Sequence, residues 1–179
     1  MPEELSKSII QTIDAGGKII NLSLGLSSSS LARYQGFRDA YDYALKKGVI
    51  VVAAAGNQGS FGQIAMYDHS WVIPVAACDT QGRIDPMSNF GYSISKSGLM
   101  APGVNITSTA PGGKYTQMSG TSTEAPFVTG TLALLLSLFP ETPAHKIINS
   151  LILNKVRNRS IIPQLLNAQE AYKLLHTHS

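Results

Sequence analysis

The sequence predicts an α/β fold built on a mainly parallel sheet, and two observations carry that prediction. The run "VIVVAAAGN", residues 49–57, is apolar on both faces of a strand, which is typical of a strand inside a parallel sheet covered by helices. Helix and strand patterns also alternate over about the first 100 residues, as right-handed crossover connections require. The chain has 179 residues, of which 44% are hydrophobic, so it can bury the core of one domain.

The elements are expected in a fixed order along the chain. Helical spacing of apolar residues predicts helices over 5–13 and 31–45, ended by Gly16-Gly17 and Gly48. Strands are expected over 18–25, over 49–57 and in the apolar run at 71–78. Residues 104–120 hold two β-rich runs around "PGG", which indicates a hairpin. The run 127–139 is apolar nearly all round and predicts a central helix, followed by helices near 147–152 and 167–176.

Composition excludes several functional classes. A net charge of +3 is too small to favour nucleic-acid or membrane binding, and no apolar stretch is long enough to span a bilayer. The basic loop "NKVRNRS" has no interleaved aromatic residues for base stacking, so we interpret it as solvated surface. The single cysteine, Cys78, excludes an intrachain disulfide and a cysteine-based zinc site, and its apolar surroundings favour a buried thiol. The cellular compartment stays open.

The segment "SGTSTEAPFVTG", residues 119–130, places a serine at the expected start of a helix. Thr121 and Glu124 have the spacing of a capping box, which is the simplest interpretation of the pattern. That interpretation leaves Pro126 unexplained, because proline cannot donate the helical hydrogen bond to the carbonyl of Ser122. Broken local rules concentrate at functional sites. We therefore expect Ser122 to lie at the positive end of the helix, where backbone N–H groups can stabilise an oxyanion.

The glycine-rich stretch "GNQGSFG" after the second strand has two interpretations. Gly56, Gly59 and Gly62 are spaced G-x-x-G-x-x-G, which is a poor match to a dinucleotide-binding loop, and no clear helix opens after them. Asn57 places a side-chain amide at the carboxyl end of a parallel strand, where α/β sheets bind ligands. A simple turn asparagine is the alternative.

Taken together, the blocks "NLSLG", "VIVVAAAGN", "MSNFG", "MAPG", "SGTSTEAPFVTG" and "LLNAQEAY" resemble the subtilisin family of serine proteases, the subtilases. The order and spacing agree from about Lys18 to Tyr172. The resemblance implies a subtilisin-like three-layer fold. It also implies that residues 1–179 form a partial catalytic domain, truncated at its N-terminal side.

The resemblance also implies roles for individual residues. Ser122 would be the nucleophile, and the oxyanion would be held by Asn57 together with the backbone N–H of Ser122. In the cleft, Ser23, Leu24 and Gly25 would pair with the backbone of an extended substrate. The pocket for the substrate residue before the cleaved bond would be lined by Ala54, Ala55 and Gly56, and it would suit a bulky apolar side chain. Glu124 stands where the family usually has a small residue, and we expect it to cap the helix. Phe127 replaces a non-catalytic histidine.

The catalytic base is missing from this pattern. A serine hydroxyl is a poor nucleophile until a base takes its proton, and the family uses a histidine oriented by an aspartate, both preceding the asparagine strand. No histidine precedes Asn57 here, and Asp14, Asp39 and Asp42 do not match the aspartate motif. His69 follows Asp68 directly, and adjacent side chains diverge; surface roles are expected for His145, His176 and His178. We expect the chain to be the C-terminal portion of a subtilase and nearly inactive alone.

The expected partners are an extended polypeptide substrate and a complementary N-terminal segment, because the strand at 18–25 would otherwise leave an open apolar edge. The chemistry needs no cofactor. The resemblance allows a structural calcium ion, although no block matches its ligands, and we assign no metal site. Two other functions stay open: a non-catalytic peptide-binding pseudoprotease, and a Rossmann-like nucleotide binder built on "GNQGSFG".

Overall fold

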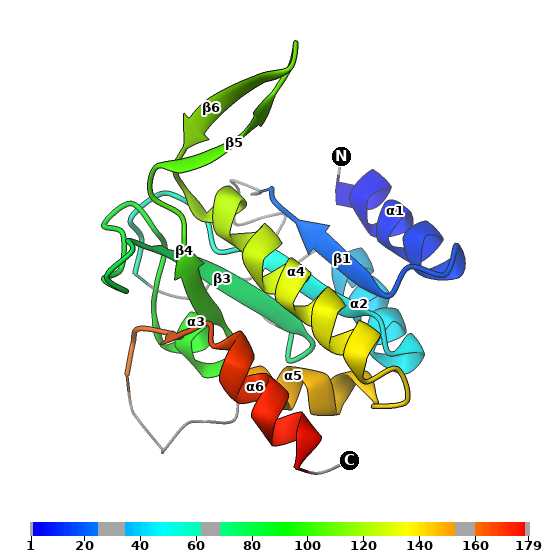
Figure 1. Cartoon of the computed structure of the whole chain (residues 1–179). Coiled ribbons are helices and arrows are strands. Elements are labelled where there is room, and N and C mark those ends of the chain that lie inside the picture. Colours follow the sequence, from blue (N-terminus) through cyan, green and yellow to red (C-terminus); the bar gives the residue numbers. More distant parts are fainter. Residues whose placement is uncertain (1, 25–34, 62–68, 153–159, 178–179) are drawn as a thin grey trace.

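A parallel sheet forms the centre of the computed structural model, which describes residues 2–24, 35–61, 69–152 and 160–177 (Figure 1). Its five strands are ordered β1-β2-β3-β4-β7, and every neighbouring pair is parallel. They are β1 (Ile19–Leu22), β2 (Ile50–Ala54), β3 (Val72–Cys78), β4 (Leu99–Pro102) and β7 (Gln164–Leu165). All residues of β2 and β3 are buried, as apolar runs in the middle of a covered sheet should be. The predicted fold class is confirmed.

Helices cover both faces of this sheet. α4 (Thr121–Leu138) packs across β1 to β4 (Figure 1). Thr129 Oγ1 on α4 donates to Asn21 Oδ1 on β1 at 3.0 Å. Asn21 therefore faces α4, and strand alternation turns its buried neighbours Ile20 and Leu22 to the opposite face. On that side they join the core formed with α1 (Pro2–Asp14) and α2 (Gln35–Lys47). The described chain thus has three layers.

The remaining elements lie around this centre. They are α3 (Tyr92–Ser97), α5 (Ala144–Ile152), α6 (Ala168–His176) and the strands β5 (Ile106–Ala110) and β6 (Lys114–Met118). β5 and β6 form the predicted antiparallel hairpin, which projects from the body of the molecule (Figure 1). Its turn contains Gly112 and Gly113 at φ 75° and 69°, the left-handed region that glycine adopts without strain.

Two expectations about the elements need correction, and some short elements were not predicted. The strand expected over 18–25 ends at Leu22, and Gly25 lies outside the described residues. The α4 helix is not enclosed, because its outer face leaves Phe127, Leu134 and Leu138 exposed at 43%, 67% and 60%. Neither α3 nor β4 was predicted, since both are short and β4 depends on non-local pairing with β3.

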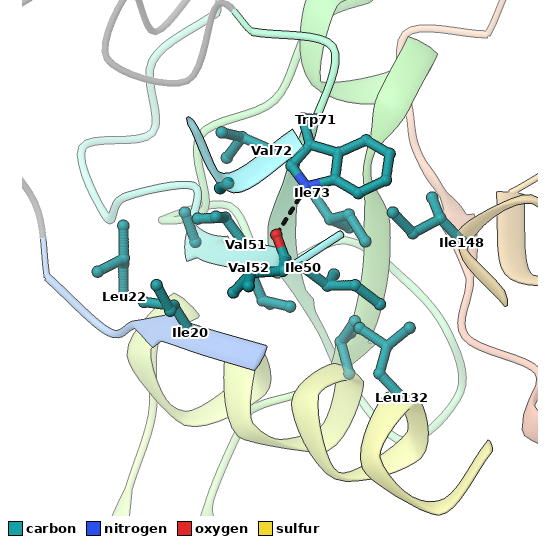
Figure 2. Close-up of a cluster of buried hydrophobic side chains, with 14 of the residues drawn as sticks. Ile20, Leu22, Ile50, Val51, Val52, Trp71, Val72, Ile73, Leu132 and Ile148 are labelled. Atoms are coloured by element: carbon teal, nitrogen blue, oxygen red, sulfur yellow. Dashed lines mark hydrogen bonds between the residues drawn. The ribbon is translucent and has the colours of Figure 1, made fainter. Parts of the chain in front are cut away.

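Trp71 joins the start of β3 to the start of β2 inside the core. Its indole Nε1 donates to the backbone carbonyl of Val49 at 2.7 Å, the bond drawn in Figure 2, and Trp71 belongs to the same buried cluster as Ile148 of α5. Trp71 is only 9% exposed, so this hydrogen bond is shielded from water. The indole therefore both fills volume and satisfies a buried carbonyl.

We expect Trp71→Phe to lower the free energy of unfolding by about 2 kcal/mol, because phenylalanine leaves the Val49 carbonyl without its donor and fills less space. Urea denaturation followed by circular dichroism measures the change. Tyr172→Phe, at an aromatic side chain that is 42% exposed, is the control and should shift the value by less than about 0.5 kcal/mol. Equal stability of the Trp71 variant and the parent would contradict this account.

Candidate active site

The first turn of α4 is tied to the loop after β2. The N-cap is Gly120, at φ 122°, and glycine has no side chain to cap the helix. Thr121 lies inside the first turn and is fully buried; its Oγ1 donates to Asn57 Oδ1 at 3.0 Å and accepts from the Gly56 amide at 3.0 Å. The predicted capping box of Thr121 and Glu124 is therefore wrong, because tertiary contacts hold the Thr121 side chain.

The orientation of the Asn57 amide follows from its contacts. Asn57 Oδ1 accepts from the backbone N–H of Thr121 at 2.8 Å, and a backbone N–H can only donate. The oxygen end therefore faces Thr121, and Nδ2 is the end left for another acceptor. Gly120 permits this approach, since a Cβ there would lie 2.8 Å from Asn57 Nδ2. Asn57 thus packs directly against the residues that precede Ser122.

Ser122 lies half-buried in the same turn, at the helix end where backbone N–H groups lack intrahelical partners. Pro126 is inside the helix, as expected, and cannot donate to the carbonyl of Ser122. That carbonyl accepts instead from Ser23 Oγ at 3.0 Å. Ser23 Oγ in turn accepts from Asn21 Nδ2 at 2.8 Å, so the end of β1 supplies the missing helical donor.

Asn89 holds the loop that carries Asn57, a role that the sequence did not predict. Its Oδ1 accepts from the amides of Gln58 and Ser60 at 3.1 and 2.9 Å, and its Nδ2 donates to the Ala55 carbonyl at 3.0 Å. Gly56 has φ 98°, and a Cβ there would lie 2.5 Å from Asn89 Nδ2. The only sequence signal was the position of Asn89 in the "MSNFG" block, because burial of a polar side chain is a tertiary property.

The residues predicted to contact substrate lie on both sides of this turn. Ser23 bonds to Ser122 as described, Leu24 is half-buried against the core, and Gly25 is outside the described residues. The side chains of Ala54 and Ala55 are buried at 2% and 1% exposure, while Gly56 is half-buried. The substrate roles of these residues stay predictions.

No histidine within the described ranges is placed near Ser122. His69 precedes β3, at the end of the sheet opposite to Asn57, and its Nε2 lies 3.2 Å from Asp42 Oδ1 on α2. Its Nδ1 accepts from the Trp71 amide at 3.2 Å. His145 and His176 are exposed on α5 and α6. The described part of the site therefore holds a serine and an amide without an imidazole.

Glu124 is the unusual group of the site. It is fully buried, and neither carboxyl oxygen has a hydrogen-bond partner. Burial raises the pKa of Glu124 to about 8, opposed in part by its own backbone amide and reinforced by the charge of Asp85. The carboxyl occupies the space above Gly103, where a Cβ would come within 0.9 Å of Oε1. Glu124 is thus a packed, uncharged acid at neutral pH.

Within the described ranges, no set of three or more histidine, cysteine, aspartate or glutamate side chains is arranged to hold a metal ion. Those same ranges contain no helix that is long and apolar enough to cross a membrane.

Comparisons with known proteins find relatives of this chain. A sequence model described as the Subtilase family matches residues 2–171. A thermophilic serine proteinase of Bacillus sp. (strain AK1) is 40% identical over 134 residues, covering 75% of this chain and 32% of that protein. Subtilisin DY of Bacillus licheniformis is 40% identical over 142 residues, covering 76% of this chain and 48% of its own length. The matched part of this chain thus spans 32% and 48% of the length of these two relatives.

Solved structures share the fold over nearly all of the chain. The prenylagaramide maturation protease PagA superposes with a TM-score of 0.85 at 29% sequence identity, covering 97% of this chain and 67% of PagA.

Proposed function

The chain belongs to the subtilase family, and from that premise we propose that it carries the nucleophile half of a serine endopeptidase site. In this proposal Ser122 attacks the peptide carbonyl, and Asn57 Nδ2 and the Ser122 amide stabilise the oxyanion. The observation that carries the proposal is the anchoring of Asn57 Oδ1 on the backbone N–H of Thr121, the residue before Ser122, which leaves Nδ2 as the donor end of the amide.

The reaction follows from this arrangement once a base is supplied. Ser122 Oγ bonds to the substrate carbonyl carbon while its proton passes to an imidazole, and the carbonyl oxygen becomes the oxyanion. The C–N bond then breaks, the leaving amine takes the proton, and water hydrolyses the acyl-enzyme by the same route. No step needs a cofactor.

We propose that the imidazole and its carboxylate come from a complementary segment, either elsewhere in a longer protein or on another chain. Two features support this partner. β1 lies at the edge of the described sheet, with β2 as its one strand neighbour there. The adjoining outer face of α4 exposes Phe127, Leu134 and Leu138. A partner that covers both would lie beside Ser122, because Ser23 at the end of β1 contacts it.

The substrate in this proposal is a polypeptide in extended conformation. Residues 23–25 would pair with its backbone as an added strand, which gives affinity without sequence preference. Ala54, Ala55 and Gly56 would line the pocket for the residue before the cleaved bond, and their small size favours a bulky apolar side chain there.

A second candidate function is peptide binding without catalysis. It is favoured by one observation. His69 bonds to the carboxylate of Asp42, but this pair lies at the end of the sheet opposite to Asn57, so it cannot serve Ser122. Such a protein would keep the cleft and the serine and would have no proton acceptor.

A fluorophosphonate probe separates these functions. We expect Ser122 to be labelled when the chain is mixed with the Asp- and His-bearing segment of a 40%-identical relative, and Ser122→Ala to abolish labelling. Asn57→Ala should slow labelling by about 100-fold. Ser108→Ala, at an exposed serine on β5, is the matched control and should label normally. Absence of labelling in the mixture, despite binding of the segment, would favour the peptide binder.

A further inference from the structure

We propose that Glu124 is a positioning residue for Ser122, whose protonated carboxyl holds the first turn of α4 against Gly103 and whose ionisation releases that turn. The consequence for catalysis rests on the proposed role of Ser122. The structural claim stands apart from it and is tested without any enzymatic activity.

The contacts around the carboxyl tie it to the turn that carries Ser122. The Gly103 carbonyl accepts from the Gly120 amide at 3.0 Å, and the Gly120 carbonyl accepts from the Thr123 amide at 2.8 Å. Glu124 is the next residue, and its carboxyl fills the volume above Gly103. The Gly103 carbonyl also accepts from Thr123 Oγ1 at 3.4 Å. The start of α4 and the connection after β4 are therefore joined by hydrogen bonds and by the packing of the Glu124 side chain between them.

The surroundings of the carboxyl cannot hold a negative charge. The charge of Asp85, in the turn after β3, acts on the carboxyl, and Glu124 in turn acts on Cys78 at the end of β3. The cation of that turn, Arg83, is paired with Asp79 at 2.7 Å. The connection from Pro102 to Asn105 carries no charged residue, and neither carboxyl oxygen has a partner. The helix N-terminus stabilises a carboxylate by less than the desolvation of a buried carboxylate costs.

Ionisation is therefore expected to drive the side chain toward solvent. The linkage has a definite sign. A released Glu124 has an ordinary pKa near 4.5 and the packed one a pKa of about 8, so the released form binds fewer protons at intermediate pH. Opening becomes about tenfold more frequent per pH unit between these values and levels off above pH 8. Ser122, two residues away, would lose its fixed position over the same range.

Cys78 is a reporter built into the chain, because it is the single cysteine, fully buried, and faces Glu124. The experiment measures its reaction rate with 4,4′-dithiodipyridine from pH 5.5 to 9 in the parent chain and in Glu124→Gln. Dividing the two rates removes the ionisation of the thiol itself. We expect the ratio to rise about tenfold per pH unit up to about pH 8 and then to become constant.

Other outcomes overturn the inference. If ionised Glu124 stayed in place, its charge would raise the pKa of Cys78, and the parent would react more slowly than Glu124→Gln. A ratio independent of pH would also refute release.

Trp71→Phe separates local opening from global unfolding. Local opening predicts an unchanged Cys78 rate in this destabilised variant, whereas a rate that rises with it would assign the exposure to global unfolding and refute the inference. The Thr123 amide bonds to the Gly120 carbonyl, and its exchange rate is compared in the same way. The ratio of that rate in the parent to the rate in Glu124→Gln should show the same pH dependence as the ratio for Cys78.

The enzymatic consequence is read separately. In the mixture with a complementary segment, fluorophosphonate labelling of the parent should fall relative to Glu124→Gln as the pH rises to 8. If no labelling occurs at any pH, the proposed function fails while the Cys78 result keeps its meaning.

Discussion

Gly103→Ala is expected to lower the free energy of unfolding by about 3 kcal/mol, because the new methyl group would occupy the position of the Glu124 carboxyl. The added Cβ would lie 0.9 Å from Oε1, 1.8 Å from Cδ and 2.4 Å from Cγ of Glu124. The carboxyl is fully buried, so it cannot shift without leaving its pocket. Chemical denaturation at pH 6, where Glu124 is uncharged in the fold, measures the loss.

The same clash predicts a rescue. Glu124→Ala removes the obstructing atoms, so Gly103→Ala in that background should cost less than about 1 kcal/mol, a coupling of about 2 kcal/mol between the two positions. Gly130→Ala is the matched control, because a Cβ at Gly130 meets nothing within 4 Å. It should stabilise α4 by up to about 1 kcal/mol in either background. Additive effects of the changes at 103 and 124 would contradict the packing described here.

The contribution of Glu124 to the free energy of unfolding is expected to fall as the pH rises from about 4.5 to about 8. Its folded-state pKa, about 8, is raised above the ordinary value of 4.5, so the folded chain binds the extra proton in this window. The stabilisation is complete below pH 4.5, is lost at about 1.4 kcal/mol per pH unit, and is constant above pH 8. The full loss is about 5 kcal/mol, and local release of the side chain would limit it.

Glu124→Gln measures this contribution, since it keeps the size of the side chain and cannot ionise. Urea denaturation of both proteins at half-unit steps of pH should give curves that agree near pH 4.5 and diverge until pH 8, with the variant more stable. Parallel curves for the parent and Glu124→Gln would show that the carboxyl is charged or hydrated in the fold.

Local patterns determined most of the fold. Apolar runs on both faces of β2 and β3 indicated buried parallel strands, and glycines indicated the ends of helices and the turn of the hairpin. Asn167 caps α6 by accepting from the Glu170 amide at 2.9 Å. These features depend on neighbours in the sequence, so periodicity and turn chemistry reveal them. The position of Ser122 at a helix start, and the broken bond at Pro126, were visible for the same reason.

Only the tertiary structure decided how the site is held. The capping pattern of Thr121 and Glu124 was misleading, because a threonine side chain satisfied by Asn57 and a carboxyl packed on Gly103 involve partners distant in sequence. Likewise, the carbonyl left free by Pro126 accepts from Ser23, 99 residues earlier. The sequence alone determines which chemical groups the chain carries. Whether a group is buried, paired or uncharged depends on contacts between segments that folding brings together.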